Sequence, residues 1–229
     1  MSPTEESKGP RYQHVHRSRD LHATDDVIEL VSKRWTLPII SELLFGPRRF
    51  SDLRSGLSRI SAKVLISRLK ELTKAGVVTH RRLSAPGRPQ VYELTQWGCR
   101  VEPVIQEMAR WTALSDTPNP IATLTNSPAG LMISLRTMFD GSRAVGTHMR
   151  IGFSFPKDTF TVTVADATFT AKREKPKDCS VVFDAPNASG IAATIFLGVA
   201  PIDAGVAVTG DAHLVRGFMD VIGGQGRDR

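Results

Sequence analysis

The segment 46–94 constrains the fold of this chain more than any other part of its sequence. Ser61 is a residue type that caps helix N-termini, and Gly76 is the type that closes a helix in the left-handed conformation. The span between them carries one apolar stripe at helical spacing, formed by Leu65, Leu69 and Leu72. We therefore predict a helix that begins after Ser61, ends before Gly76 and packs through its leucines.

The face of this helix opposite the leucines is polar and basic. At about 100° per residue, the positions on that side are Lys63, Ser67, Lys70 and Lys74. Such a helix, following a tight turn, has the geometry of a recognition helix in a DNA major groove. We expect the first three of these residues to face the groove and Ser61 to lie near a phosphate. Arg68 falls nearer the packed side, so we expect it to contact backbone phosphate and not a base.

Two flanking elements complete the pattern. Before the helix, three apolar residues at helical spacing predict a shorter helix after the Gly46-Pro47 break: Phe50, Leu53 and Leu57. After it, two extended runs within 77–95 predict a β-hairpin around residues 85–87. Helix, turn, helix and basic hairpin together predict a winged helix. Three arginines of the flanks are expected to bind DNA, two on the phosphate backbone and the last at the wing tip by the minor groove: Arg48, Arg49 and Arg88.

The charge of the chain is unevenly distributed. It carries 30 Lys and Arg against 23 Asp and Glu, a formal charge of +7. The excess falls before residue 115, where 19 basic residues stand against 12 acidic ones, and the remainder carries 11 of each. Nucleic acid is the commonest partner for such asymmetry, because neutralised phosphates release counterions. A solvated basic surface is the alternative on charge alone, and the helix and hairpin pattern favours DNA.

Length and composition bound the remaining possibilities. At 229 residues the chain is long enough for two modest domains. No apolar run approaches the ~18 residues that a membrane helix needs, so we expect no membrane insertion. Cys99 and Cys179 lie far apart and indicate neither a disulfide framework nor a zinc site, which favours a reducing cytoplasm, with the protein on the nucleoid through DNA binding. Residues 1–20 are polar and predict a mobile tail.

A further helix is predicted over 98–114. One side of it is apolar: Val101, Val104, Ile105, Met108 and Trp111. Such a stripe needs a partner. Packing within the chain is one solution, and pairing with a second chain in a homodimer is the interpretation we favour. Prolines at 118, 120 and 128 then mark 115–128 as a linker, so the first domain is expected to span 21–114.

Residues 129–229 follow a different pattern. After a short helix over 131–139, alternating residues predict half-buried strands at 151–155, 160–165, 168–171 and 180–183. A helix over 187–197, a strand over 205–209 and a helix over 211–221 that Asp211 caps complete the order. This order predicts an α+β domain, a curved sheet with helices on one face.

Several sequence blocks occur in order over about residues 25–112, including Lys33-Arg34-Trp35, Phe45-Gly46-Pro47, Ala75-Gly76-Val77 and Tyr92-Glu93-Leu94-Thr95. In these blocks the first domain resembles the HxlR family of bacterial winged-helix regulators, a branch close to the MarR type. The resemblance implies an obligate homodimer, joined through its terminal helices, that binds a near-palindromic operator in double-stranded DNA. Oxidant-sensing members of that family use a cysteine just before the first core helix, and the segment 21–24 holds none.

The second domain has its own sequence blocks: residues 178–184, a helix to Leu197-Gly198, and the run 207–211 that ends in Thr-Gly-Asp. With these it resembles a sterol-carrier-protein type lipid-binding domain. The resemblance implies an apolar tunnel for acyl chains or sterols between the sheet and its helices. Seven residues are candidates for its lining: Phe153, Phe155, Phe160, Phe183, Ile195, Phe196 and Phe218. For each of them an ordinary place in the core is the alternative, and a ligand-free dimerisation platform is the alternative for the whole domain.

Other chemistry finds no support in the sequence. No G-x-S-x-G, P-loop or H-E-x-x-H pattern occurs, so we expect neither an enzyme nor a cofactor. The histidines at 14, 16 and 22 lack a carboxylate or cysteine at ligand spacing, so we expect no metal. Two hypotheses remain. The first is a transcription regulator whose second domain binds an apolar small molecule or lipid and thereby modulates operator binding. The second is a lipid-binding or small-ligand-binding protein whose winged helix serves protein contacts only.

Overall fold

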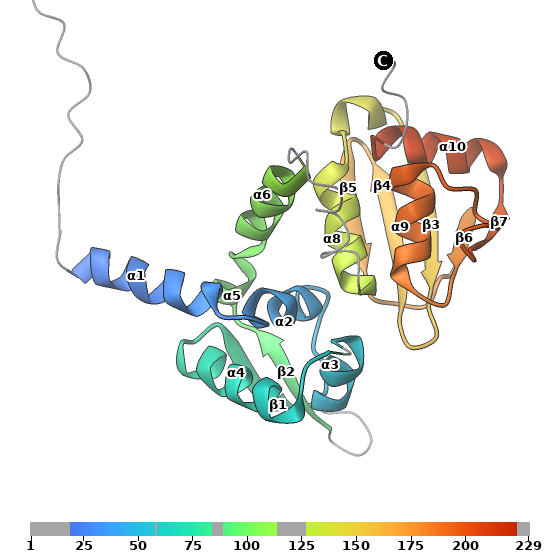
Figure 1. Ribbon diagram of the computed structural model, residues 1–229. Coiled ribbons are helices and arrows are strands. Elements are labelled where there is room, and N and C mark those ends of the chain that lie inside the picture. The colour runs from blue at the N-terminus through green and yellow to red at the C-terminus, as the bar shows by residue number, and fades with distance from the viewer. Residues whose placement is uncertain (1–18, 58, 84–88, 114–126, 224–229) are drawn as a thin grey trace, which may run out of the picture.

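The computed structural model describes residues 19–57, 59–83, 89–113 and 127–223. These residues form two lobes that lie side by side (Figure 1). The winged-helix domain holds helices α1 to α6 and a two-stranded sheet. The second domain holds helices α8 to α10 and a five-stranded sheet.

The winged-helix domain has the predicted order of elements. Its bounds are α1 Arg19–Ser32, α2 Thr36–Leu43, α3 Phe50–Gly56, α4 Ala62–Lys74, β1 Val78–Arg82, β2 Gln90–Leu94, α5 Gln96–Cys99 and α6 Glu102–Ala113. Strands β1 and β2 pair antiparallel and form the wing. The backbone of Arg48 exchanges two hydrogen bonds with Tyr92 of β2, at 2.9 and 2.8 Å. The chain before α3 thus joins the wing sheet through an antiparallel β-bridge.

The predicted ends of α4 are confirmed. The Ser61 hydroxyl accepts a hydrogen bond from the Val64 N–H at 3.3 Å, which satisfies one of the free donors of the first turn. At the other end Gly76 is left-handed, with a φ of +73°. The N–H of Val77 donates to the Leu72 carbonyl and that of Gly76 to the Thr73 carbonyl, the paired bonds of a Schellman motif. The leucine stripe lies in the core, with Leu65, Leu69 and Leu72 at most 1% exposed.

The second domain is built on a mixed sheet of order β5-β4-β3-β6-β7, in which only the β3–β6 pair is parallel. The strands are β3 His148–Ser154, β4 Thr159–Ala165, β5 Thr168–Lys172, β6 Val181–Asp184 and β7 Ala207–Gly210. The helices are α8 Pro128–Met138, the 3-10 turn η1 Gly141–Ala144, α9 Ala188–Leu197 and α10 Ala212–Val221. Side chains of Asn187 and Asp211 cap α9 and α10, the latter as predicted.

Helix α8 belongs to both cores. Leu131, Met132 and Leu135 lie in the core of the second domain, whereas Ile133 is buried in that of the winged-helix domain. Arg136 of α8 forms an ion pair with Glu102 of α6. The sequence pattern predicts a short amphipathic helix over 131–139 and places it in the second domain alone, because such a pattern does not indicate a second partner.

Three predicted boundaries need correction. Residues 1–18 lie outside the described residues, but α1 already begins at Arg19, inside the expected tail. The helix expected over 98–114 is broken into α5 and α6 around Arg100. Of the expected linker, residues 115–126 lie outside the described residues. Ser127 is the N-cap of α8 and Pro128 its first residue, where a missing N–H costs nothing.

Candidate nucleic-acid interface

The outward face of α4 is the first part of the candidate site. Lys63, Ser67, Lys70 and Lys74 are all exposed, as the helical spacing predicts. None of the three lysines forms an ion pair with another described residue, so their ammonium groups remain available to an anionic partner. Ser67 is engaged within the helix, where its hydroxyl donates to the Glu71 carboxylate at 3.0 Å.

Arg68 points back to the protein. Its guanidinium pairs with Glu71, and its Nε donates to the backbone carbonyl of Arg34 at 3.2 Å. Lys33 reaches the same carboxylate of Glu71 at 3.4 Å. Arg68 therefore ties α4 to the junction of α1 and α2, and the donors expected to reach a phosphate are engaged within the protein.

The two arginines before α3 lie in opposite environments. Arg49 is exposed at the start of α3, where its N–H donates to the Asp52 carboxylate at 3.2 Å. Arg48 is buried. Its guanidinium makes a two-pronged contact with Asp158 of the second domain, Nη1 to Oδ1 at 2.7 Å and Nη2 to Oδ2 at 3.0 Å. The Arg48 donors that the sequence assigns to DNA phosphate are thus occupied by a carboxylate of the neighbouring domain.

Arg48 is one of four charged residues that form a buried junction between the domains, which we call the charged junction: Glu42, Arg48, Asp158 and Arg173. Arg173 lies between the two carboxylates, with Nη2 at 3.2 Å from Glu42 and Nε at 3.2 Å from Asp158. It also donates to the Glu42 carbonyl at 3.1 Å and stacks over the ring of Phe160 at 4.9 Å. Two basic and two acidic side chains thus meet in one enclosed site.

Glu42 occupies the most enclosed position of the charged junction. Burial raises the pKa of its carboxyl above the ordinary value, against the opposing charges of Arg173 and Arg48. Gly56 of α3 lies directly against it, since a Cβ at that position would come within 3.2 Å of the carboxylate. The sequence held one signal for this site, because Glu42 follows Ile39 by three residues and so shares the buried face of α2.

The wing carries the remaining predicted contacts. Arg81 and Arg82 on β1 are exposed, and Arg81 pairs across the wing with Glu93. Arg88, expected at the wing tip, lies outside the described residues. Among the described residues, the exposed basic groups at the positions predicted from the sequence are therefore the α4 face, Arg49 and β1.

Comparisons with known proteins bear on this half of the chain. The sequence profile described as HxlR-like helix-turn-helix matches residues 30–118. The HTH-type transcriptional regulator YodB of Bacillus subtilis is 36% identical over 87 residues, which cover 38% of this chain and 78% of YodB. The uncharacterized HTH-type transcriptional regulator YvaP of the same organism is 37% identical over 89 residues, 38% of this chain and 81% of YvaP.

The chain belongs to the HxlR-like helix-turn-helix family. Its relatives are transcriptional regulators and not enzymes. Among solved structures, the reduced form of YodB from B. subtilis shares 33% identity and covers 42% of this chain and 95% of its own, with a TM-score of 0.40. Within the residues that the structure describes, no helix is both long and apolar enough to cross a membrane.

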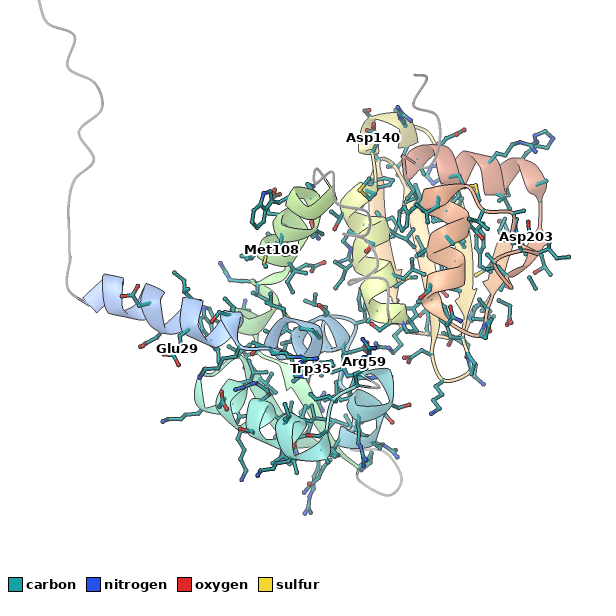
Figure 2. All side chains as sticks on the ribbon, in the orientation of Figure 1. Glu29, Trp35, Arg59, Met108, Asp140 and Asp203 are labelled. Carbon is teal, nitrogen blue, oxygen red and sulfur yellow. The ribbon has the colours of Figure 1, made fainter. Side chains whose placement is uncertain are left out.

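In this HxlR-like protein the apolar stripe of α6 is divided between two surroundings. Ile105 is buried and belongs to the core of the winged-helix domain. Three residues on the other side are exposed, Val104 by 50%, Met108 by 44% and Trp111 by 73%. Met108 is marked in Figure 2. Val27 and Ile28 of α1 add further exposed apolar surface.

The seven tunnel candidates of the HxlR-like chain gather in the second domain. All except Phe196 are buried, and Phe196 packs at the edge of the same core. Phe153 stacks on Phe183 with ring centres 5.4 Å apart, and Phe218 lies 6.1 and 6.4 Å from these two rings. The candidates are thus brought together, and in the described state several of them pack against each other.

Proposed function

We propose that the protein is a homodimeric bacterial transcription regulator that binds a near-palindromic operator through α4 and the wing. The exposed polar and basic face of α4 carries this proposal. That face is held rigidly, because capping fixes both ends of the helix and the leucine stripe anchors its other side. Lys63, Ser67 and Lys70 would then face the major groove, with Ser61 and Arg49 near phosphates. Arg88 would border the minor groove.

The exposed apolar side of α6 supports the homodimer. Val104, Met108 and Trp111 follow each other at spacings of four and three residues, so they form one strip along the helix. A strip with two large side chains costs free energy in water and suits a symmetric contact with the same strip of a second chain. Two α4 helices related by that symmetry would read half-sites about one turn, ~34–36 Å, apart.

Duplex binding tests the proposal directly. The full-length protein should bind a mixed-sequence duplex, and log K should fall steeply with log salt. The double variant Lys63→Ala, Lys70→Ala should flatten this slope by about 0.9 for each phosphate that is no longer neutralised. The matched control is Lys177→Ala, which removes an exposed lysine of the second domain. A wild-type protein that does not bind duplex even at low salt would favour the alternative, in which the winged helix serves protein contacts only.

Sedimentation tests the dimer. The wild-type chain should sediment as a dimer at micromolar concentration, and Trp111→Asp should shift it towards monomer. Arg143→Asp, a change of an exposed residue in the second domain, is the control and should leave the dimer intact. A wild-type monomer would contradict this part of the proposal.

We further propose that the second domain, residues 129–229, is sterol-carrier-like and binds an apolar or amphipathic small molecule that modulates DNA affinity. The aromatic cluster supplies an apolar interior, and the charged junction supplies a route to the DNA-binding half. Arg48 holds Asp158 by its side chain and Tyr92 of the wing by its backbone, so a shift of the second domain would move the wing. A ligand changes affinity only if it prefers one arrangement of the dimer.

Native mass spectrometry of the purified full-length dimer tests this part. We expect lipid to co-purify with the dimer. Removal of this lipid should change the affinity for duplex DNA. The packed rings of Phe153, Phe183 and Phe218 favour the competing view of a ligand-free platform. A lipid-free dimer whose duplex affinity does not respond to added fatty acid would decide for that platform.

A further inference from the structure

The turn between β3 and β4 carries two adjacent charged residues that face opposite ways. Asp158 is buried in the charged junction, where Arg48 and Arg173 hold its carboxylate. Lys157 is exposed. The turn itself is closed by the N–H of Phe155, which donates to the Asp158 carbonyl at 2.9 Å. Because Asp158 is fixed, the position of Lys157 is fixed with it.

Lys157 lies against the helix-turn-helix. Its ammonium group is 2.9 Å from the hydroxyl of Ser55, on the exposed side of α3. Figure 1 shows the β3–β4 loop descending beside α3 at the lower end of the second domain. Among the described residues no carboxylate forms an ion pair with Lys157.

The surface around α3 is already basic. Arg49 precedes the helix, Arg54 lies on it and Arg59 follows it, and all three are exposed. Figure 2 marks Arg59 close to α3. In a helix-turn-helix the first helix of the pair crosses the phosphate backbone while the second enters the groove. Lys157 therefore adds a fourth cation to a surface whose expected neighbour is a row of phosphates.

We propose that Lys157 of the second domain contacts a DNA phosphate beside α3, so that the second domain forms part of the DNA interface. This inference rests on the proposed DNA-binding function and extends it to the other domain. The charged junction places the lysine, and the phosphate supplies the counter-charge that none of the described residues provides. Contacts of this kind add affinity for all sequences and carry no base specificity.

A purely structural role for Lys157 is the competing explanation. The Lys157–Ser55 hydrogen bond could fasten the turn to α3. The turn, however, is already held by the two-pronged Arg48–Asp158 contact and by Arg173. An exposed bond between a lysine and a hydroxyl contributes little beside that, because water competes for both groups.

The test uses the full-length dimer and a mixed-sequence duplex of roughly 40 base pairs, which extends past two half-sites one turn apart. Fluorescence anisotropy over a range of salt concentrations gives the slope of log K against log salt. Lys157→Ala should flatten this slope by about 0.9 for each lysine, hence about two per dimer, and weaken binding. Lys157→Arg should keep the wild-type slope. The matched control is Lys177→Ala, which also removes one exposed lysine of the second domain. Lys177 lies shortly before Ser180, whose N–H donates to the Arg150 carbonyl near the start of β3, whereas Lys157 follows the end of that strand.

Ser55→Ala separates the two explanations, because it removes the internal hydrogen bond and keeps the cation. It should retain the wild-type slope. If Ser55→Ala weakens binding and flattens the slope as much as Lys157→Ala does, the role is structural and the inference is overturned. If Lys157→Ala keeps the wild-type slope while Lys63→Ala with Lys70→Ala flattens it, this inference alone fails. A wild-type dimer without duplex binding would overturn both this inference and the proposed function.

Discussion

On α4, exposed lysines have no acidic partner among the described residues, while at the charged junction two arginines and two carboxylates are enclosed between the domains. Both regions are built from the same types of side chain, and in the sequence Arg48 and Arg49 stand next to each other. Their surroundings differ because Arg48 is the residue whose backbone pairs with β2, which turns its side chain towards the second domain. Adjacent cations can therefore act on different partners, one within the molecule and one outside it.

The two regions should respond differently to mutation. An exposed lysine contributes little to folding, and its attraction to phosphate is screened by salt. A buried ion pair that loses one partner leaves the other charge without water or counter-ion, which costs several kcal/mol. Substitutions in the charged junction should therefore change the free energy of unfolding, and substitutions on the α4 face should change DNA affinity.

The largest effect is expected at Arg48. Arg48→Ala should lower the free energy of unfolding by about 3–5 kcal/mol, because Asp158 loses its two-pronged partner in a buried site. Arg49→Ala should change it by less than about 0.5 kcal/mol and instead flatten the salt slope of duplex binding. Urea unfolding followed by circular dichroism measures the first quantity. Equal destabilisation by the two substitutions would show that the contrast between these neighbours does not exist.

A smaller effect is expected at Arg68, which shares features of both regions. It lies on the recognition helix but binds Glu71 and the Arg34 carbonyl. Arg68→Ala should cost about 1 kcal/mol of stability, the usual range for a partly exposed pair with an added hydrogen bond. The salt slope of duplex binding should stay at the wild-type value. If Arg68→Ala reduces the salt slope by about one, the result would instead support the phosphate contact that the sequence predicts.

The last expected effect comes from the titration of Glu42. Its pKa is raised above an ordinary value of 4.5, so the folded chain keeps a proton that the unfolded chain has already released. Stability from this group therefore falls as pH rises from about 4.5 to the folded pKa and is constant outside that window. Glu42→Gln should remove this fall, whereas Glu174→Gln, at an exposed carboxylate, should not. Urea unfolding at a series of pH values measures this effect. Parallel curves of unfolding free energy against pH for the wild type and Glu42→Gln would contradict it.

Local signals in the sequence predicted much of the fold. The α4 ends follow from Ser61 and Gly76, and the start of α10 from Asp211, because capping depends on residues close in the chain. The α4 face was predicted for the same reason, since helical periodicity alone decides which residues oppose the leucines.

The remaining features depend on contacts between distant segments. Arg48 and Asp158 are 110 residues apart, and no local pattern distinguishes an arginine that binds phosphate from one that binds such a carboxylate. The same holds for Lys157, whose position depends on how the second domain is docked. The break between α5 and α6 was missed because the apolar positions on both sides of Arg100 continue the helical period.

The position of Ile133 has a consequence for the autonomy of the winged-helix domain. A fragment that stops at residue 114 would lack this isoleucine, which the second domain supplies to the core of the first. Such a fragment would also leave Glu42 and Arg48 facing water without Asp158 and Arg173. The intact chain is therefore expected to unfold in a single cooperative transition, and neither half could be exchanged with that of another protein unless α8 and its contacts were transferred as well.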